Sequence, residues 1–347
     1  MRCLVVVSML AGVAACHSST PAGPAGPDSS LASDATVLDT TPNQWVWVPV
    51  PGTTCANGTT AGFGLDRSAT PGGDVFIYFE GGGACWDTAT CTANPPVAIN
   101  LDVTYTAQQL AKDVAALTVD RAVGPPLDTA NYVFVPYCTG DLHAGTTVTT
   151  YPGGPTLHHT GATNTQAFVD LLAPAFAAAQ VVWVTGSSAG GYGATLDFDR
   201  FTTAWPDASV NLLEDSAPFI PFLANYDKLQ TAWKIAFPPG CTGCDASFTA
   251  AFDAVAAAHP TSRIGLMTWD NDQTVAAYFG YTTSLVPVQD ELITNHFDHP
   301  NTQVFEAAGT SHTMFGQLAT VQSHGVKLSD WVTRWLVGDA AWATVRP

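Results

Sequence analysis

The residues best suited to nucleophilic chemistry are the serines of a short, glycine-flanked segment. Residues 186–190 read Gly-Ser-Ser-Ala-Gly and follow residues 181–184, an apolar run typical of a buried strand. A G-x-S-x-G pattern between a strand and a helix predicts a nucleophile elbow, a sharp turn that requires small neighbours and exposes one serine hydroxyl. The spacing of the glycines favours Ser188 as the nucleophile and leaves Ser187 as the alternative.

A second glycine-rich segment could stabilise the negative charge that attack by a serine creates. Residues 80–83 read Glu-Gly-Gly-Gly and follow a predicted strand, residues 75–79. Backbone N–H groups without side chains in the way can face a reacting carbonyl oxygen. We expect Gly82, Gly83 and the N–H of Ala189 to form an oxyanion hole; the alternative is an ordinary glycine-rich turn.

A serine nucleophile also needs a base, and position selects one of the nine histidines. His312 lies in a loop after residues 303–305, the last predicted strand, and before a helical pattern. His296 and His299 precede that strand, and His324 falls in the later helical region. His312 is therefore the predicted base.

The carboxylate that orients the base is expected at a strand end between the serine and the histidine. Residues 264–268 predict such a strand, and Asp270 and Asp272 follow it. Asp270 is closer to the strand and is the first choice, with Asp272 as the alternative; either could instead cap the next helix. The order Ser188, Asp270, His312 is that of the α/β-hydrolases.

Strands alternate with helical patterns along the chain. Residues 168–176 and 328–336 carry apolar side chains at helical spacing. This alternation predicts an α/β fold of the α/β-hydrolase type over residues 43–347, with a mostly parallel central sheet and helices on both faces. Chemistry collects at the carboxyl ends of such strands. The predicted strands are residues 75–79, 132–135, 181–184, 210–213, 264–268 and 303–305.

The N-terminus predicts export. Residues 1–15 have Arg2 followed by a short apolar core, which is typical of a signal peptide. Cys16 ends a Val-Ala-Ala-Cys segment that looks like a bacterial lipobox and is the predicted lipidation site, the alternative being an ordinary secretory signal. We therefore expect a lipoprotein of the bacterial cell envelope or a secreted protein. Residues 16–42 then form a lipidated, flexible tether. Since no apolar run approaches the roughly 20 residues of a membrane-spanning helix, a lipid anchor is the only membrane contact we expect.

Six cysteines remain beyond the leader, and an even number in an exported chain predicts three disulfides. Cys85 with Cys91 and Cys241 with Cys244 are close enough to pair locally, although six cysteines allow 15 pairings. Cys241 and Cys244 could also be a redox pair or half of a zinc site, but an oxidising compartment favours a structural bridge. The remaining two are Cys55 and Cys138.

Charge and the other histidines exclude several function classes. The chain has 29 acidic and 11 basic residues, a net charge of −18, so no basic surface is available for nucleic acid. The pairs His158–His159 and His296–His299 have no convincing partner ligands and are expected to be loop histidines rather than a metal site. We expect a monomer that uses neither metal nor cofactor.

Together these motifs resemble the pectin acetylesterase/Notum family of carboxylesterases over about residues 55–335. The resemblance implies a serine esterase acting on O-acyl esters, such as those of an acetylated polysaccharide. The alternatives are a lipase or peptidase with the same triad, or a non-catalytic surface lipoprotein on a hydrolase scaffold. Plant members remove acetyl groups from pectin, and Notum members remove a long acyl group from a signalling protein. The matching segments begin at Cys55, Phe79, Tyr137, Gly186, Asp270 and Ser311.

The resemblance also implies specific pairings and one departure. It implies disulfides Cys55–Cys138 and Cys85–Cys91, and it favours Asp270 over Asp272 because Asp270 begins an Asp-x-x-Gln segment. Many members carry an aromatic residue near the glycine signature where this chain has Gly83-Ala84, with Trp86 just beyond. We therefore expect the acyl pocket to differ within the family.

Overall fold

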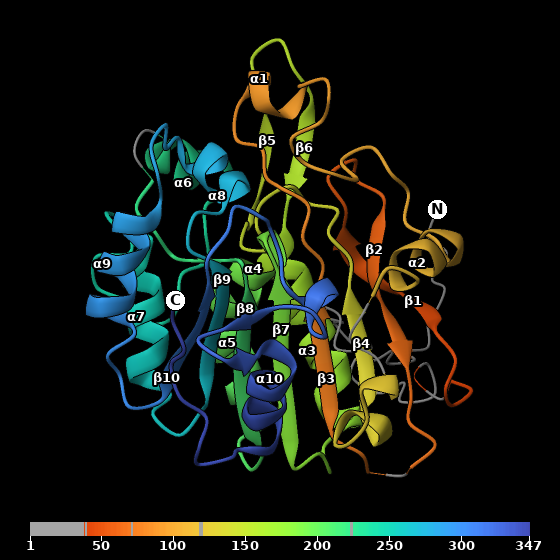
Figure 1. Ribbon diagram of the computed structural model, residues 1–347. Coiled ribbons are helices and arrows are strands. Elements are labelled where there is room, and N and C mark those ends of the chain that lie inside the picture. The colour runs from red at the N-terminus through yellow and green to blue at the C-terminus, as the bar shows by residue number, and fades with distance from the viewer. Residues whose placement is uncertain (1–37, 39, 71, 118–120, 223–224) are drawn as a thin grey trace, which may run out of the picture. The chain divides into compact units, whose positions relative to one another are not determined.

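The computed structural model describes residues 38, 40–70, 72–117, 121–222 and 225–347 (Figure 1). The predicted signal peptide, the predicted lipidation site Cys16 and nearly all of the tether lie outside these residues, so they stay predictions. The residues described here belong to one compact unit.

An eight-stranded sheet runs through this unit in the order β1-β2-β4-β3-β7-β8-β9-β10. At one edge β2 pairs antiparallel with both of its neighbours, β1 and β4, and the other neighbouring strands pair in parallel. This arrangement confirms the predicted α/β fold with a mostly parallel sheet. The strands are β1 (Val46–Thr54), β2 (Thr60–Asp66), β4 (Asn131–Val135), β3 (Val75–Phe79), β7 (Val181–Ser187), β8 (Ser209–Asp215), β9 (Ile264–Trp269) and β10 (Thr302–Ala307).

The central strands are apolar throughout because helices cover both faces of the sheet. In β7, Val182 and Val184 pack into one hydrophobic cluster while Trp183, between them, packs into the other. The second cluster includes Trp331 and Trp335, from the C-terminal helix. The helices around the sheet include α3 (Gly161–Ala175), α4 (Ala189–Leu196), α5 (Phe198–Ala204), α7 (Thr249–Ala258), α9 (Val286–His296) and α10 (Leu328–Val337).

The smaller elements include a group beyond the carboxyl end of the sheet. Figure 1 shows α6, α8 and the β5–β6 hairpin at this end, at the top of the view. These elements are placed to border a site built on the strand ends. The smaller elements are α1 (Thr88–Cys91), α2 (Ala107–Val114), α6 (Tyr226–Trp233), α8 (Gln273–Phe279), the 3₁₀ turns η3 (Arg121–Val123), η4 (Leu127–Thr129) and η5 (Phe315–Gln317), and the hairpins β5 (Thr147–Thr150)–β6 (Thr156–His159) and β11 (Gln322–Ser323)–β12 (Val326–Lys327).

Three disulfides join the six cysteines as predicted: Cys55–Cys138, Cys85–Cys91 and Cys241–Cys244. The first links the start of the β1–β2 connection to the segment that follows β4. Disulfides of this kind persist in oxidising compartments. Within the described part of the chain, no helix has the length and apolarity needed to cross a bilayer.

Candidate active site

Ser188 stands at the turn between β7 and α4 with a strained backbone. Its φ is 54° and its ψ is −124°, a conformation that residues other than glycine rarely adopt. The turn is held by two backbone hydrogen bonds: the Ser188 N–H donates to the Asp215 carbonyl at 2.7 Å, and the Gly191 N–H donates to the Ser188 carbonyl at 2.9 Å. Strain of this kind is concentrated at functional sites and is characteristic of a nucleophile elbow.

The glycines around Ser188 are required by close backbone contacts. A Cβ on Gly186 would lie 2.4 Å from the Gly190 carbonyl, and one on Gly190 would lie 2.0 Å from the carbonyl oxygen of Phe79 at the end of β3. Both distances are too short for any side chain. The small residues in this pattern therefore bring the end of β3 against the first turn of α4.

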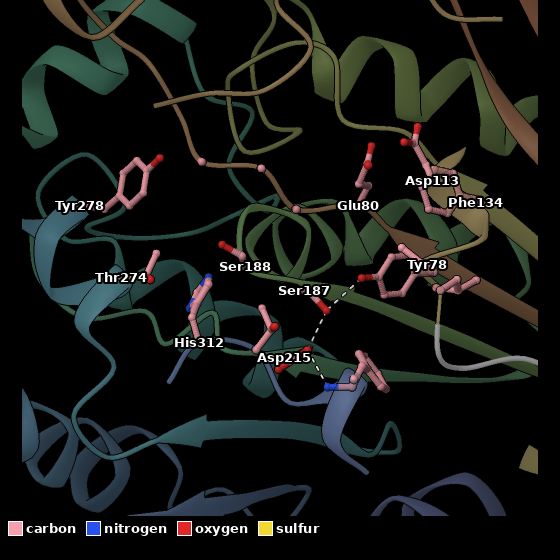
Figure 2. Close-up of a pocket in the computed structure, with 18 residues that line it drawn as sticks. Tyr78, Glu80, Asp113, Phe134, Ser187, Ser188, Asp215, Thr274, Tyr278 and His312 are labelled. Carbon is pink, nitrogen blue, oxygen red and sulfur yellow. Dashed lines mark hydrogen bonds between the residues drawn. The ribbon is translucent and has the colours of Figure 1, made fainter. Parts of the chain in front are cut away.

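The hydroxyl of Ser187 is engaged elsewhere. Ser187 Oγ donates to Asp215 Oδ2 at 2.7 Å and accepts from the Tyr78 hydroxyl at 3.0 Å, as the dashed lines in Figure 2 show. Ser188 points away from this network, and it lines both cavities at the strand ends together with His312. Of the two serines, Ser187 is thus tied into this network, and Ser188 is the candidate nucleophile.

The glycine run after β3 lies against Ser187 and Ser188. A Cβ on Gly81 would be 2.3 Å from the Ser187 carbonyl oxygen, and one on Gly83, whose φ is +79°, would be 1.9 Å from the Val97 carbonyl oxygen. Gly82, Gly83 and Ala189 line the cavities beside Ser188. Within the residues that the structure describes, their three amide N–H groups have no hydrogen-bond acceptor.

His312 is held by a carboxylate, and that carboxylate is Asp272. His312 Nδ1 lies 2.6 Å from Asp272 Oδ2, while Asp272 Oδ1 accepts the N–H groups of Thr274 at 2.9 Å and Val275 at 3.0 Å. Asp272 is fully buried at the start of α8. The other ring nitrogen, His312 Nε2, is buried without a hydrogen-bond partner among the described residues.

This geometry corrects the sequence-based choice of Asp270 as the partner of His312. Asp270 Oδ1 instead accepts the Gly309 N–H at 2.9 Å and so shapes the loop that carries His312. The physical reason is the end of β9, which continues to Trp269, one residue beyond the predicted strand. The chain then turns through Asp270 and Asn271, and the next side chain to face the imidazole is that of Asp272.

Two cavities meet at Ser188. One has a volume of about 440 Å³ and the other of about 30 Å³. Ser188, His312 and Gly83 line both, together with Thr274 and Tyr278. An ester carbonyl at Ser188 could therefore extend its two substituents into different spaces.

The smaller cavity is apolar and closed by large side chains. Trp86, Tyr192 and Phe279 line it. The rings of Tyr192 and Phe279 lie 5.9 Å apart between centroids, and the three side chains are buried. Without their displacement the cavity admits only a group of a few atoms.

The larger cavity has a polar wall with carboxyl groups. Glu80 and Asp113 lie there beside Tyr78, on the far side of the cavity from Tyr278 (Figure 2). Glu80 Oε2 accepts the Tyr137 N–H at 2.7 Å, and burial raises the pKa of Glu80 to about 8. Burial also raises the pKa of Asp113, which accepts a hydrogen bond from the Tyr105 hydroxyl. Among the described residues that line this cavity, none is Lys or Arg.

The remaining histidines of interest have structural surroundings. His159 is buried and contacts the Tyr151 hydroxyl and the Thr139 carbonyl, both at 2.8 Å. Cys85 and Cys91 lie near it, but their sulfurs form a disulfide and offer no thiolate to a metal. His296 pairs with Asp253 at 2.9 Å, away from the strand ends.

Two residues near the site escaped the sequence analysis. His143 is buried after β4, and its Nε2 lies 2.9 Å from the Glu80 carbonyl oxygen, just before the glycine run. Asp215 is buried at the end of β8. Its position at the carboxyl end of a predicted strand was a usable signal, because the catalytic groups of such folds gather there.

Comparison with known proteins places the chain in a family. Residues 39–236, more than half of the 347, match the family model described as Pectinacetylesterase. This segment contains the glycine run and Ser188, whereas Asp272 and His312 lie beyond it. The chain is also similar to known esterases. It is 32% identical to palmitoleoyl-protein carboxylesterase notum2 of Xenopus laevis over 42% of this chain and 30% of that protein.

The chain is also 27% identical to pectin acetylesterase 5 of Arabidopsis thaliana, over 49% of this chain and 40% of that protein. The aligned segments thus cover less than half of the length of these two relatives. The structure of the Wnt deacylase Notum from Drosophila superposes with a TM-score of 0.66 over 87% of this chain and 95% of that one. At 16% identity, this match shows a shared α/β-hydrolase fold. From the family match, the chain belongs to the pectinacetylesterase family.

Proposed function

We propose that this chain is a serine carboxylesterase that hydrolyses short O-acyl esters, with acetyl as the preferred acyl group. Ser188 is the nucleophile, His312 the base and Asp272 the carboxylate that orients the base. One observation carries the proposal: the imidazole of His312 is fixed through Nδ1 to Asp272, while Nε2 is left without a partner beside the strained Ser188.

The mechanism follows from these positions. His312 Nε2 accepts the proton of Ser188 Oγ as the oxygen attacks the ester carbonyl, and the N–H groups of Gly82, Gly83 and Ala189 stabilise the oxyanion. The imidazolium then gives its proton to the leaving alcohol, which departs and leaves an acyl-enzyme. Water, deprotonated by His312, attacks the acyl-enzyme, and the imidazolium returns this proton to Ser188 Oγ as the carboxylic acid departs. The chemistry requires no cofactor.

The two cavities assign the two halves of the ester. The acyl group enters the 30 Å³ cavity, because its walls of Trp86, Tyr192 and Phe279 suit a methyl group and obstruct a long chain. The alcohol occupies the 440 Å³ cavity, whose size and polar wall suit a hydroxyl-rich carbohydrate. This assignment favours an acetylated polysaccharide over a long-chain acyl protein. The three disulfides support an exported enzyme, with Cys16 as the proposed lipid anchor.

A series of p-nitrophenyl esters from acetate to palmitate tests the proposal. We expect kcat/KM to be highest for acetate and to fall with chain length. Ser188→Ala should lower kcat by about 10⁶-fold, as complete triad knockouts do. Phe279→Ala should move the preference toward longer chains, whereas Phe134→Ala, which truncates an aromatic side chain of the larger cavity, should not.

Two results would contradict this function. Faster turnover of palmitate than of acetate would reject the assignment of the small cavity to the acyl group. Full activity in Ser188→Ala, or failure of the native protein to turn over any ester and to react with a fluorophosphonate, would reject the esterase itself.

A further inference from the structure

Asp215 joins the two parts of the site that must meet for catalysis. It is fully buried at the end of β8, the strand between the nucleophile strand β7 and the strand β9 that leads to Asp272. None of the triad roles above uses its carboxylate. Burying a carboxylate costs folding free energy unless hydrogen bonds compensate for the lost water. The groups that donate hydrogen bonds to Asp215 therefore show which segments it anchors.

On one side Asp215 holds the nucleophile elbow. Its Oδ2 accepts the Ser187 hydroxyl at 2.7 Å, and its backbone carbonyl accepts the Ser188 N–H at 2.7 Å. Ser187 Oγ in turn accepts the Tyr78 hydroxyl, which connects β3 to the same network. The two hydrogen bonds to Asp215 therefore fix Ser187 and Ser188 at the turn where Ser188 has its positive φ.

On the other side Asp215 holds the loop that carries His312. Its Oδ1 accepts the Met314 N–H at 2.6 Å, and its Oδ2 accepts the Phe315 N–H at 3.1 Å. The next residue extends this anchor, since Ser216 Oγ accepts the Thr313 N–H at 3.0 Å. Three successive amides after His312 are thus tied to the end of β8.

We propose that Asp215 is a positioning residue that sets the separation between Ser188 Oγ and His312 Nε2 by clamping the elbow and the histidine loop to one carboxylate. The inference rests on the proposed esterase function. It adds Asp215, as a fourth polar side chain, to the proposed triad of Ser188, His312 and Asp272. Each carboxylate oxygen accepts one loop amide, so neither oxygen can become an NH₂ group without losing a loop contact.

The preceding residue provides a matched control. Glu214 is fully buried on the same strand, and its Oε1 accepts the Thr195 hydroxyl at 2.6 Å. Among the described residues its side chain makes no hydrogen bond to Ser187 or to the residues after His312, and its Oε2 has no partner. Glu214→Gln therefore removes a buried carboxyl group of the same strand without cutting the clamp.

The experiment measures kcat and KM for p-nitrophenyl acetate, active-site titration with a fluorophosphonate, and thermal stability in the full chain. A misplacement of about 1 Å costs roughly 10²-fold in rate. We expect Asp215→Asn to lower kcat per titrated site by about that factor with KM within about threefold. Glu214→Gln should keep kcat within about threefold.

A double-mutant cycle tests whether Asp215 acts through the histidine loop. If it does, adding Asp215→Asn to His312→Ala should change the residual rate by less than about threefold, because the group being positioned is already gone. Ser187→Ala, which cuts one bond of the clamp and leaves the carboxylate, should lower kcat by less than Asp215→Asn does. It serves as the test if Asp215→Asn does not fold.

The outcomes separate this inference from the proposed function. Loss of activity in Ser188→Ala with normal kcat per titrated site in Asp215→Asn would overturn the clamp and leave the esterase in place. So would normal kcat in Ser187→Ala when Asp215→Asn does not fold, or a full 10²-fold loss in the His312→Ala background. A native protein that neither turns over esters nor reacts with the fluorophosphonate would overturn both.

Discussion

The nucleophile region and the acid–base region of the site are held by different forces. In the nucleophile region, at the ends of β3 and β7, backbone packs on backbone: a side chain on Gly190 would come within 2.0 Å of the Phe79 carbonyl oxygen. In the acid–base region, after β9 and β10, hydrogen bonds of side chains fix the geometry. Asp272 holds the imidazole of His312, and Asp270 holds the Gly309 amide. Besides the Asp215–Ser187 hydrogen bond, the nucleophile region therefore depends on the space that its glycines leave free, whereas the acid–base region depends on the charge and direction of particular side-chain atoms.

This difference predicts opposite sensitivities. Added volume should damage the nucleophile region, because its contacts leave no space for a Cβ. Substitutions of equal size should damage the acid–base region, because they exchange an acceptor for a donor while leaving the packing intact. The two predictions below, taken from the larger expected effect to the smaller, test each side of the comparison.

The acid–base region should be most sensitive at Asp272. Asp272→Asn can keep the helix cap to Thr274 and Val275 but presents an NH₂ group to His312 Nδ1, or else loses the cap. The wrong imidazole tautomer typically costs about 10⁴-fold in kcat, which we expect here with p-nitrophenyl acetate.

Asp270→Asn is the matched control two residues away. An asparagine there can still accept the Gly309 N–H through its side-chain oxygen, so kcat should fall by less than tenfold. A larger loss in Asp270→Asn than in Asp272→Asn would reject Asp272 as the carboxylate partner of the base.

The nucleophile region should be sensitive to a single methyl group at Gly190. Gly190→Ala forces the start of α4 away from the end of β3, and overpacking of this kind costs about 1–3 kcal/mol of unfolding free energy. Denaturant unfolding measures the loss. Gly316→Ala is the control, because a Cβ there meets nothing within 4 Å, and it should lose no stability. Equal stability of the two variants would show that the backbone contact is not rigid.

The same contrast explains what the sequence could predict. Glycines that close contacts require leave a pattern in the sequence. Such patterns made it possible to predict the turn at Ser188 and the glycine run at residues 80–83. The choice between Asp270 and Asp272 leaves none, because both follow β9 and the direction of each side chain depends on the turn between them. Capping a helix and orienting a base looked like alternative roles for a carboxylate here, yet Asp272 both caps α8 and lies within hydrogen-bond distance of the His312 imidazole.

The strands show a similar contrast between elements that could be predicted from the sequence and elements that could not. All six predicted strands are present as β3, β4, β7, β8, β9 and β10, since buried parallel strands read as apolar runs. The antiparallel strands β1 and β2 were missed. Pro49 and Pro51 interrupt β1, and Gly62 and Gly64 interrupt β2. Proline is tolerated in an edge strand, and Gly62 is needed because a Cβ there would lie 2.2 Å from the Val48 carbonyl oxygen. Asp215 was overlooked because its role depends on a loop 99 residues later in the chain.

The most direct test of the account is to locate the covalent adduct on the native protein. After reaction with a fluorophosphonate and proteolysis, mass spectrometry of the peptide that contains residues 187 and 188 should place the phosphonate on Ser188. An adduct on Ser187, whose hydroxyl donates to Asp215, or on neither serine, would contradict the proposed site.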